Sequence, residues 1–259
     1  MQKITIKKII QKKNDTPITC LTAYSKNIAK IADKYCDIIL VGDSLGMVLY
    51  GMKTTRDVKI ETMILHAKAV KNFAKKSLVV FDMPYKTYAN KFTAYKNAKR
   101  VIKLTKCDAI KLEGGIKIVN VIKYLVKKGI PVMGHVGLMP QTSTNFKVKG
   151  KNFVQKKKIL KDALAISNSG VFAIIIECVV ENLARKITKS VSIPTIGIGA
   201  SRYCDGQILV TEDMLGLSDF SPKFVKQYTN LNKIMEKSIK NYVKDVKMRR
   251  FPSFKNVYK

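Results

Sequence analysis

The chain has 259 residues, of which 46% are hydrophobic, so it can bury the core of one large domain, and a fibrous or disordered protein is excluded. Its 49 lysine and arginine residues and 18 acidic residues give a formal charge of +31, which raises the question of a nucleic-acid partner. Nearly all the basic residues are lysine, however, and they are dispersed over the whole chain. We therefore interpret the charge as a solvated lysine-rich surface and expect no specific nucleic-acid partner.

The cysteines and the apolar segments are typical of a cytoplasmic protein. The five cysteines are odd in number, and no two form the close pair of a zinc ribbon or redox motif, so we expect reduced, mostly buried thiols. Lysines interrupt the apolar residues of the N-terminus, unlike those of a signal peptide. The most apolar stretch, 171–180, is too short to cross a membrane and contains Glu177.

Eight short apolar runs, each followed by a segment that is mostly of helical spacing, make up most of the chain. The runs lie at 18–24, 37–44, 77–84, 109–115, 131–138, 172–179, 194–200 and 207–213. Runs that are apolar almost throughout suit parallel strands buried on both faces. Eight of them in this length favour a (β/α)8 barrel over an open doubly wound sheet. We expect a single domain over 1–259, with a helix from Pro222 to about Val246 and a basic tail from about 247.

Polar and ionisable residues lie at the C-terminal ends of five successive runs, where the active site of such a barrel forms. They are Asp43, Ser44, Asp82, Lys111, Glu113, His135 and Glu177. Each alone has an ordinary explanation, since an aspartate often caps a helix and a lone histidine is often a hydrogen-bonded core residue. Together they indicate a site, because burying several charges near one another is costly without a metal or a substrate.

Three of these carboxylates, Asp43, Asp82 and Glu113, follow neighbouring predicted strands, and no cysteine joins them in the pattern. Hard oxygen ligands suit Mg²⁺ far better than a soft metal. A magnesium ion held this way keeps positions open for water and for an anionic, chelating substrate, and an α-keto acid fits them.

Seven blocks in chain order carry a resemblance to a known family. They are LVGDSLGM (40–47), FDMPY (81–85), IKLEGG (110–115), GHVGLMPQ (134–141), IIIECV (174–179), IGIGA (196–200) and DGQILV (205–210). They closely resemble the ketopantoate hydroxymethyltransferase family, from about residue 18 to 228. The resemblance implies a (β/α)8 barrel, typically a homodecamer, that uses Mg²⁺ and 5,10-methylenetetrahydrofolate. It implies transfer of a hydroxymethyl group to 3-methyl-2-oxobutanoate, giving 2-dehydropantoate and tetrahydrofolate in pantothenate and coenzyme A biosynthesis.

The matching motifs also imply roles for the residues. Asp43 and Asp82 would hold the metal, with Glu113 as a further or water-mediated ligand. Glu177 would accept the proton from the substrate. The keto-acid site would include Asp43, Ser44, Asp82, Lys111 and His135.

Two segments depart from the family pattern. Ser25 stands where many relatives have an aspartate, which leaves one outer contact of the site in question. The segment 142–152, TSTNFKVKGKN, contains less glycine than the usual family loop, so its mobility over the site would differ. Neither change removes a proposed catalytic residue.

Two alternatives remain at this stage. One is a related Mg²⁺-dependent barrel acting on keto acids, such as a carbon–carbon lyase of the phosphoenolpyruvate mutase group, although its cysteine-bearing motif is absent. The other is a basic nucleic-acid-binding protein on a barrel without activity, which steep salt-dependent binding to unrelated DNA would support. The complete set of acids argues against a barrel without activity.

Overall fold

The computed structural model describes residues 2–143, 145–218 and 222–258. Contacts within it divide the chain into two compact units, Met1–Val210 and Thr211–Lys259. The first unit contains all eight strands and the residues predicted to form the site. The expectation of one domain over the whole chain stays a prediction.

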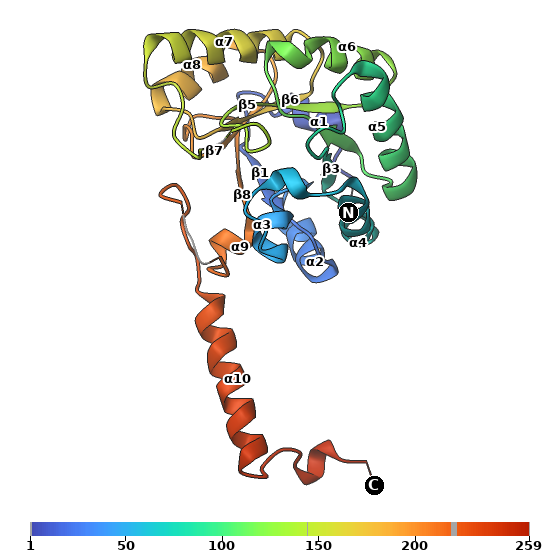
Figure 1. Ribbon diagram of the computed structural model, residues 1–259, viewed down its shortest axis with the longest axis vertical. Coiled ribbons are helices and arrows are strands. Elements are labelled where there is room, and N and C mark those ends of the chain that lie inside the picture. Colours follow the sequence, from blue (N-terminus) through green and yellow to red (C-terminus); the bar gives the residue numbers. More distant parts are fainter. Residues whose placement is uncertain (1, 144, 219–221, 259) are drawn as a thin grey trace. The chain divides into compact units, whose positions relative to one another are not determined.

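Eight parallel strands form a closed barrel in chain order, with β1 pairing both β2 and β8 (Figure 1). The strands are β1 (Ile18–Thr22), β2 (Ile38–Val41), β3 (Leu78–Asp82), β4 (Ala109–Lys111), β5 (Val132–Gly137), β6 (Ala173–Glu177), β7 (Thr195–Ile198) and β8 (Gly206–Leu209). The predicted (β/α)8 barrel is therefore confirmed. The last run was drawn too long, because the chain leaves β8 after Leu209 and begins a helix at Thr211.

The longer helices follow strands and cover the outside of the barrel (Figure 1), whereas the first helix precedes β1 and buries Ile9. The helices of this unit are α1 (Ile6–Gln11), α2 (Lys26–Tyr35), α3 (Leu45–Tyr50), η1 (Thr55–Asp57), α4 (Ile60–Phe73), α5 (Lys91–Thr105), η2 (Ile116–Ile118), α6 (Val119–Lys127), α7 (Phe153–Ser167) and α8 (Glu181–Ser190). Side-chain caps begin several of them. Asn90 accepts hydrogen bonds from two backbone N–H groups of α5, and Asn152 accepts one in α7.

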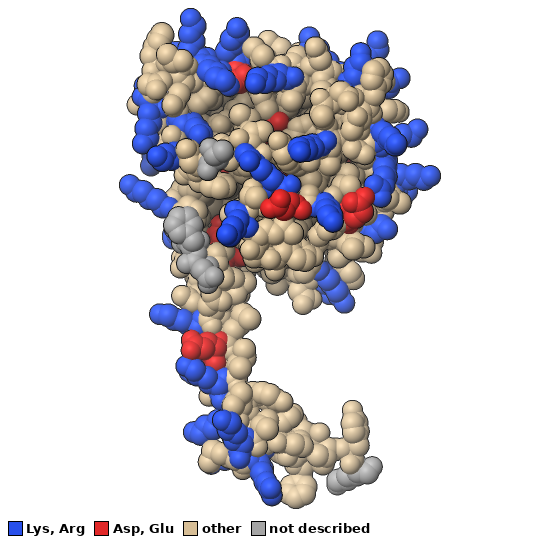
Figure 2. All heavy atoms as spheres, in the orientation of Figure 1, with Lys and Arg blue, Asp and Glu red and all other residues tan. Residues whose placement is uncertain are grey.

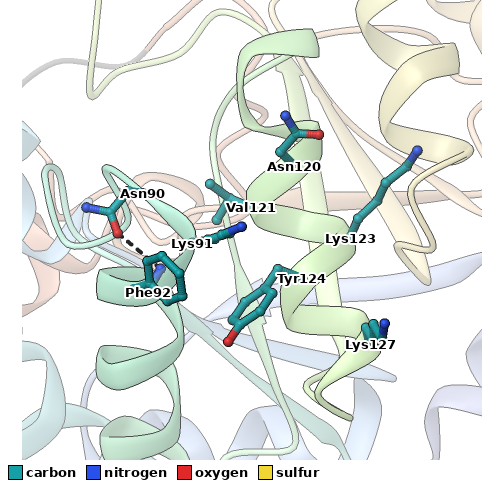
Figure 3. Close-up of a pocket in the computed structure, with 8 residues that line it drawn as sticks. All are labelled: Asn90, Lys91, Phe92, Asn120, Val121, Lys123, Tyr124 and Lys127. Carbon is teal, nitrogen blue, oxygen red and sulfur yellow. Dashed lines mark hydrogen bonds between the residues drawn. The ribbon is translucent and has the colours of Figure 1, made fainter.

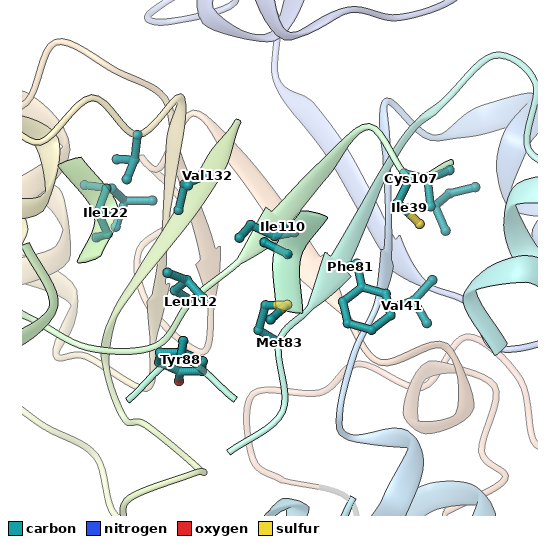
Figure 4. Close-up of a cluster of buried hydrophobic side chains, with 14 of the residues drawn as sticks. Ile39, Val41, Phe81, Met83, Tyr88, Cys107, Ile110, Leu112, Ile122 and Val132 are labelled. Atoms are coloured by element: carbon teal, nitrogen blue, oxygen red, sulfur yellow. The ribbon is translucent and has the colours of Figure 1, made fainter. Parts of the chain in front are cut away.

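The apolar residues of most strands divide into two buried clusters, as the alternation of a strand buried on both faces requires. One cluster contains residues from all eight strands, among them Ile38, Val80 and Met133, and so fills the inside of the barrel. The other packs strand residues such as Ile39, Phe81 and Ile110 toward the helices (Figure 4). Strands β2, β3 and β4 are buried at every position, which explains their continuous apolar runs.

Aspartates precede three of the even-numbered strands and fasten the N-terminal end of the barrel. Asp37, before β2, accepts a hydrogen bond from the Thr19 N–H of β1. Asp108, before β4, accepts one from Val79 in β3, and Asp205, before β8, accepts one from Thr195 in β7. Each also pairs with lysine: Lys12 with Asp37, Lys3 and Lys71 with Asp108, and Lys13 with Asp205.

The second unit contains α9 (Thr211–Met214), α10 (Leu231–Lys247) and η3 (Phe254–Asn256). The helix predicted from Pro222 begins nine residues later than expected, at Leu231. The reason is Asn230, which has non-helical backbone angles and accepts a hydrogen bond from Lys233 N–H with its side chain, the geometry of an N-cap. The helix ends at Lys247, and none of its residues is buried.

Cysteine burial, surface charge and helix length match the expectations from composition. All five cysteines are free and buried. Lysine and arginine side chains are scattered over the face shown in Figure 2 rather than gathered in one stripe. Among the residues that the structure describes, no helix is both long enough and apolar enough to cross a bilayer.

Candidate active site

The strand alternation that fills the barrel with apolar side chains brings charged ones to its C-terminal end. Val80 of β3 belongs to the inner cluster, and Asp82, two residues later, keeps the same inward register. The same step of two leads from Ala109 to Lys111 and from Ile175 to Glu177. Parallel pairing places these ends side by side, with Asp82 opposite Lys111. Asp82, Lys111 and Glu177 therefore meet at the C-terminal end of the barrel, where they form the inward-facing layer that follows the apolar inner cluster.

Lys111 is the cation at the centre of this layer. Its Nζ lies 2.9 Å from both carboxylate oxygens of Asp82 and 3.5 Å from Glu113 Oε1. All three side chains are at most 4% exposed. Burial alone would lower the pKa of Lys111, but the negative charges of Asp82, Glu113 and Asp43 outweigh it and raise the pKa above its ordinary value. The lysine is therefore a permanent positive charge at the site.

Asp43 lies beside this pair, just after β2. Its backbone N–H is 3.4 Å from Asp82 Oδ2, and its own Oδ2 accepts a hydrogen bond of 2.8 Å from Gln141 Nε2. Burial, followed by the negative charges of Asp82 and Glu113, raises the pKa of Asp43 well above its ordinary value. A cation bound nearby would therefore favour the ionised form of this carboxylate.

His135 lies between two of the acids. Its Nε2 is 2.6 Å from Leu138 O and 3.5 Å from Glu177 Oε2, whereas Nδ1 is 3.7 Å from Glu113 Oε1 and has no hydrogen-bond partner among the described residues. Burial and the charge of Lys111 lower the pKa of His135 well below its ordinary value. A neutral imidazole that donates from Nε2 to Leu138 O satisfies this geometry.

Glu177 is the most accessible of the acids, with 17% of its side chain exposed. Burial raises its pKa to about 8, with Lys111 opposing this and Asp43 and Asp82 adding to it. Burial likewise raises the pKa of Glu113 to about 8, with Lys111 opposing and Asp82 and Glu177 adding to the rise. Both groups thus exchange protons near neutral pH, as groups in acid–base catalysis do.

The backbone around Glu177 is held in an unusual conformation. Cys178, the next residue, has φ of +47°, in the left-handed region, and its N–H and C=O bond to Ile198 and Lys149. Gly137 of β5 runs so close that an added Cβ would lie 2.3 Å from Glu177 O. Gly137, the second glycine of GHVGL, is therefore required for the close approach of β5 to the end of β6.

Ser44 directly follows Asp43 in the chain and precedes α3. Its hydroxyl lies 2.7 Å from that of Tyr24, and it makes no capping bond to the helix. Ser25 is exposed and caps α2 by accepting a hydrogen bond from Ile28 N–H. Of the glycine-poor segment 142–152, Thr144 lies outside the described residues.

Two buried side chains of the site, Gln141 and Tyr88, were not identified from the sequence as site residues. Gln141 is fully buried, and its amide contacts Asp43 and the hydroxyl of Tyr88. Gln141 ends the block GHVGLMPQ, so its place directly after a predicted strand end was the available signal. Nothing comparable marked Tyr88, which lies within a polar stretch before α5.

The donor set fits a hard divalent cation. Four carboxylates, Asp43, Asp82, Glu113 and Glu177, face a single cationic side chain, Lys111. No group of three or more His, Cys, Asp or Glu residues in the described part of the chain could alone hold a metal ion. Mg²⁺ commonly takes one or two protein carboxylates and completes its shell with water and substrate, so the excess negative charge and the donor chemistry suit it.

A separate surface cavity of about 590 Å³ lies between α5 and α6 (Figure 3). It is lined by Asn90, Lys91, Phe92, Asn120, Val121, Lys123, Tyr124 and Lys127. None of the residues of the acid cluster lines it, so it is not the candidate active site.

Comparisons with known proteins agree with the geometry. The family model described as ketopantoate hydroxymethyltransferase matches residues 3–254. A 3-methyl-2-oxobutanoate hydroxymethyltransferase of Pelagibacter ubique is 53% identical over 249 residues, 96% of this chain and 97% of that protein. Another of the same name, from Bartonella tribocorum, is 50% identical over 263 residues, 100% of this chain and 97% of that protein.

Solved structures resemble the fold at lower identity. A 2,3-dimethylmalate lyase of the PEP mutase/isocitrate lyase superfamily has a TM-score of 0.63 at 11% identity, covering 98% of this chain and 88% of its own. A phosphonopyruvate hydrolase complex with oxalate and Mg²⁺ also has 0.63 at 11%, covering 99% and 93%. These likenesses concern the fold alone, whereas the family match spans nearly the whole sequence. The chain belongs to the ketopantoate hydroxymethyltransferase family.

Proposed function

We propose that this chain transfers a hydroxymethyl group from 5,10-methylenetetrahydrofolate to 3-methyl-2-oxobutanoate, giving 2-dehydropantoate and tetrahydrofolate in pantothenate biosynthesis. The observation that carries the proposal is the single inward layer in which Asp82, Lys111 and Glu177 meet beside Asp43. Relatives of about 50% identity that bear the corresponding enzyme name support the reaction. The folate donor rests on the family's activity.

The acids of the site divide into metal ligands and a base in this proposal. Asp43 and Asp82 would hold Mg²⁺, and Glu113 would contact it directly or through water, since Asp82 and Glu113 both contact Lys111 and both raise the pKa of Asp43. When bound, the ion would draw electron density from the keto group of the substrate and acidify the neighbouring C–H. Lys111 and Ser44 face the keto acid, and His135 lines its pocket.

Glu177 is the residue that we assign to proton removal. Its pKa of about 8 lets the carboxylate accept a proton and return it near neutral pH. Its side chain is also the most accessible of the acids, which suits a group that must reach the substrate. Loss of the C3 proton leaves an enolate, whose carbon bonds to the electrophilic one-carbon unit of the folate. The two C–N bonds of that unit break, water supplies the hydroxyl oxygen of the product, and the two folate nitrogens take up protons as tetrahydrofolate leaves. The positive charge of Lys111 lies where negative charge develops.

Deuterium exchange tests the base assignment without the folate. Purified protein is incubated with Mg²⁺ and 3-methyl-2-oxobutanoate in D₂O, and the C3–H signal is followed by NMR. We expect metal-dependent exchange in the wild type and a loss of about 10²–10⁴-fold in Glu177→Gln, the usual contribution of a positioned base. Retained exchange in Glu177→Gln would remove this residue from the role. No exchange in folded, metal-loaded wild type would favour the lyase alternative.

The assembly and the compartment are further parts of the proposal. Helix α10 exposes apolar side chains at Ile234, Met235, Ile239 and Tyr242, which supports self-association, and the family resemblance suggests a homodecamer. Light scattering after gel filtration would measure this, and a monomer would contradict it. Five free, buried cysteines support a reducing, cytoplasmic environment, which labelling of the cellular protein with thiol reagents after denaturation would test.

A further inference from the structure

Gln141 is the one fully buried amide side chain among the described residues, and it lies between the acids of the site. It belongs to the loop that leaves β5, whereas the acids that it contacts follow β2 and β4. A buried amide with four hydrogen-bonding sites is costly unless each site has a partner. Its partners therefore reveal what the loop holds in place.

Both N–H groups of the side-chain amide are used. Nε2 donates to Asp43 Oδ2 at 2.8 Å and to Met83 O at 3.0 Å. Met83 directly follows Asp82, so one amide group ties the acid after β2 to the chain that leaves β3. The other oxygen, Asp43 Oδ1, is not the one that the amide contacts. The amide therefore fixes one oxygen of Asp43 and leaves the other for a ligand.

The remaining groups of Gln141 fix Glu113. The Gln141 backbone N–H donates to Glu113 Oε2 at 3.1 Å. Its side-chain Oε1 accepts from the Tyr88 hydroxyl, whose oxygen lies 3.3 Å from the Glu113 N–H. Gln141 thus holds the Glu113 carboxylate directly and the Glu113 backbone through Tyr88.

The loop is also anchored independently of the Gln141 side chain. Arg56 Nε donates to Gln141 O at 2.9 Å, and Arg56 Nη2 donates to Ser143 O at 3.3 Å. At the far end of the loop, the side chain of Gln155 accepts from the Gly150 and Lys151 N–H groups. A change confined to the Gln141 side chain consequently removes the bond to Asp43 while these anchors remain.

We propose that Gln141 is a positioning residue, which orients Asp43 through its side chain and Glu113 through its backbone, so that each carboxylate keeps one oxygen outside its contact with Gln141 for the divalent cation. The inference rests on the proposed metal site. Groups that orient metal ligands from behind typically change metal affinity or activity by about 10–100-fold when they are removed. The proposed metal site is therefore complete only when the β5–α7 loop is folded against the barrel.

The test measures binding of Mn²⁺ alone, by the loss of its free EPR signal, in wild type, Gln141→Met and Gln141→Asn. Methionine keeps the length without a donor, and asparagine keeps the amide but withdraws it from Asp43. Gln155→Met is the matched control, because it makes the same chemical change in the first turn of α7, where the side chain holds the end of the same loop without touching an acid. Circular dichroism establishes that each variant is folded. If Gln141→Met does not fold, the Mn²⁺ affinity of Gln141→Asn alone tests the proposal.

We expect about 10–100-fold weaker Mn²⁺ binding in both Gln141 variants and a change below about twofold in Gln155→Met. Raising Mg²⁺ should restore most of the deuterium exchange of the Gln141 variants, so the defect lies in the metal concentration required rather than in the rate at saturation. Binding within twofold of wild type in a folded Gln141 variant would overturn the inference, as would an equal loss in Gln155→Met. Failure of the wild type to bind Mn²⁺ would instead reject the proposed metal site, and the inference with it.

Discussion

The two ends of the barrel carry carboxylates in opposite circumstances. At the N-terminal end, Asp37, Asp108 and Asp205 each have at least one lysine and accept a backbone N–H from the neighbouring strand. At the C-terminal end, four carboxylates share the single cation of Lys111. The first set is balanced within the protein, whereas the second carries an excess of negative charge.

The difference separates acids that lysines of the protein balance from acids whose charge a ligand could balance. A balanced carboxylate stabilises the strands that it joins and gains nothing from a metal ion. An unbalanced one weakens the folded state until a cation or substrate arrives, a cost that natural proteins accept at functional sites. Replacing acids at each end should therefore change stability and metal binding in opposite ways.

The largest effect is expected for Asp43→Asn at the C-terminal end. Removal of a negative charge relieves its repulsion with Asp82 and Glu113, so the metal-free protein should unfold at the same or a higher temperature. Mg²⁺ binding should weaken by at least about 100-fold, more than for loss of an orienting group. Calorimetric titration and thermal unfolding measure both quantities. Unchanged metal affinity would remove Asp43 from the ligand set.

The matching change at the N-terminal end is Asp205→Ala. Asp205 pairs with Lys13 at 2.9 Å and accepts from the Asn14 and Thr195 N–H groups, and its side chain is 3% exposed. Its loss leaves a lysine and two backbone donors without their partner, so the free energy of unfolding should fall by about 2–4 kcal/mol. Mg²⁺ affinity of the folded protein should be unchanged. A variant as stable as wild type in urea would contradict the contrast between the two ends.

The sequence predicted the barrel well because β strands buried on both faces leave continuous apolar runs. It predicted the ends of elements less well. The helix expected from Pro222 begins at Leu231, since the pattern of apolar residues does not reveal that Asn230 would cap it. The run ending at 213 contained the first turn of α9, because Thr211, Glu212 and Asp213 follow apolar residues without a break.

The site was predicted from the acids, but its hydrogen bonds were not. Strand ends could be located from the sequence, and inward register then places Asp82, Lys111 and Glu177 together. The partners of Gln141 depend on how a loop after β5 folds over three other strands, which no local pattern encodes. The N-terminal aspartates could have been found, because Asp37 is the first residue of a predicted strand, and Asp108 and Asp205 stand one and two residues before theirs.

A smaller effect, on the pH dependence of stability, follows from the same contrast. In the metal-free protein the pKa values of Glu113 and Glu177 are about 8, above the ordinary 4.5, so the folded state binds more protons than the unfolded state between these values. The free energy of unfolding is therefore not reduced by these two groups below about pH 4.5, and it falls as pH rises toward 8. Asp205 behaves in the opposite way: burial alone would raise its pKa, but hydrogen bonds from Asn14 and Lys13 hold it below the ordinary 3.8, so its contribution is lost as pH falls below that value.

The melting temperature in EDTA from pH 3 to 9 should consequently fall in two ranges for different reasons. It falls toward acid pH (the acid limb) through Asp205 and toward alkaline pH (the alkaline limb) through Glu113 and Glu177. A loss on the order of 1 kcal/mol lowers the melting temperature of a chain of this size by about 2–4 °C, so the alkaline limb is measurable. Glu177→Gln should flatten that limb because the amide does not titrate, and Mg²⁺ should flatten it because a bound cation favours the ionised acids. Asp205→Ala should flatten only the acid limb. An alkaline limb that responds to neither Glu177→Gln nor Mg²⁺ would mean that the C-terminal carboxylates are as well balanced in solution as those at the N-terminal end.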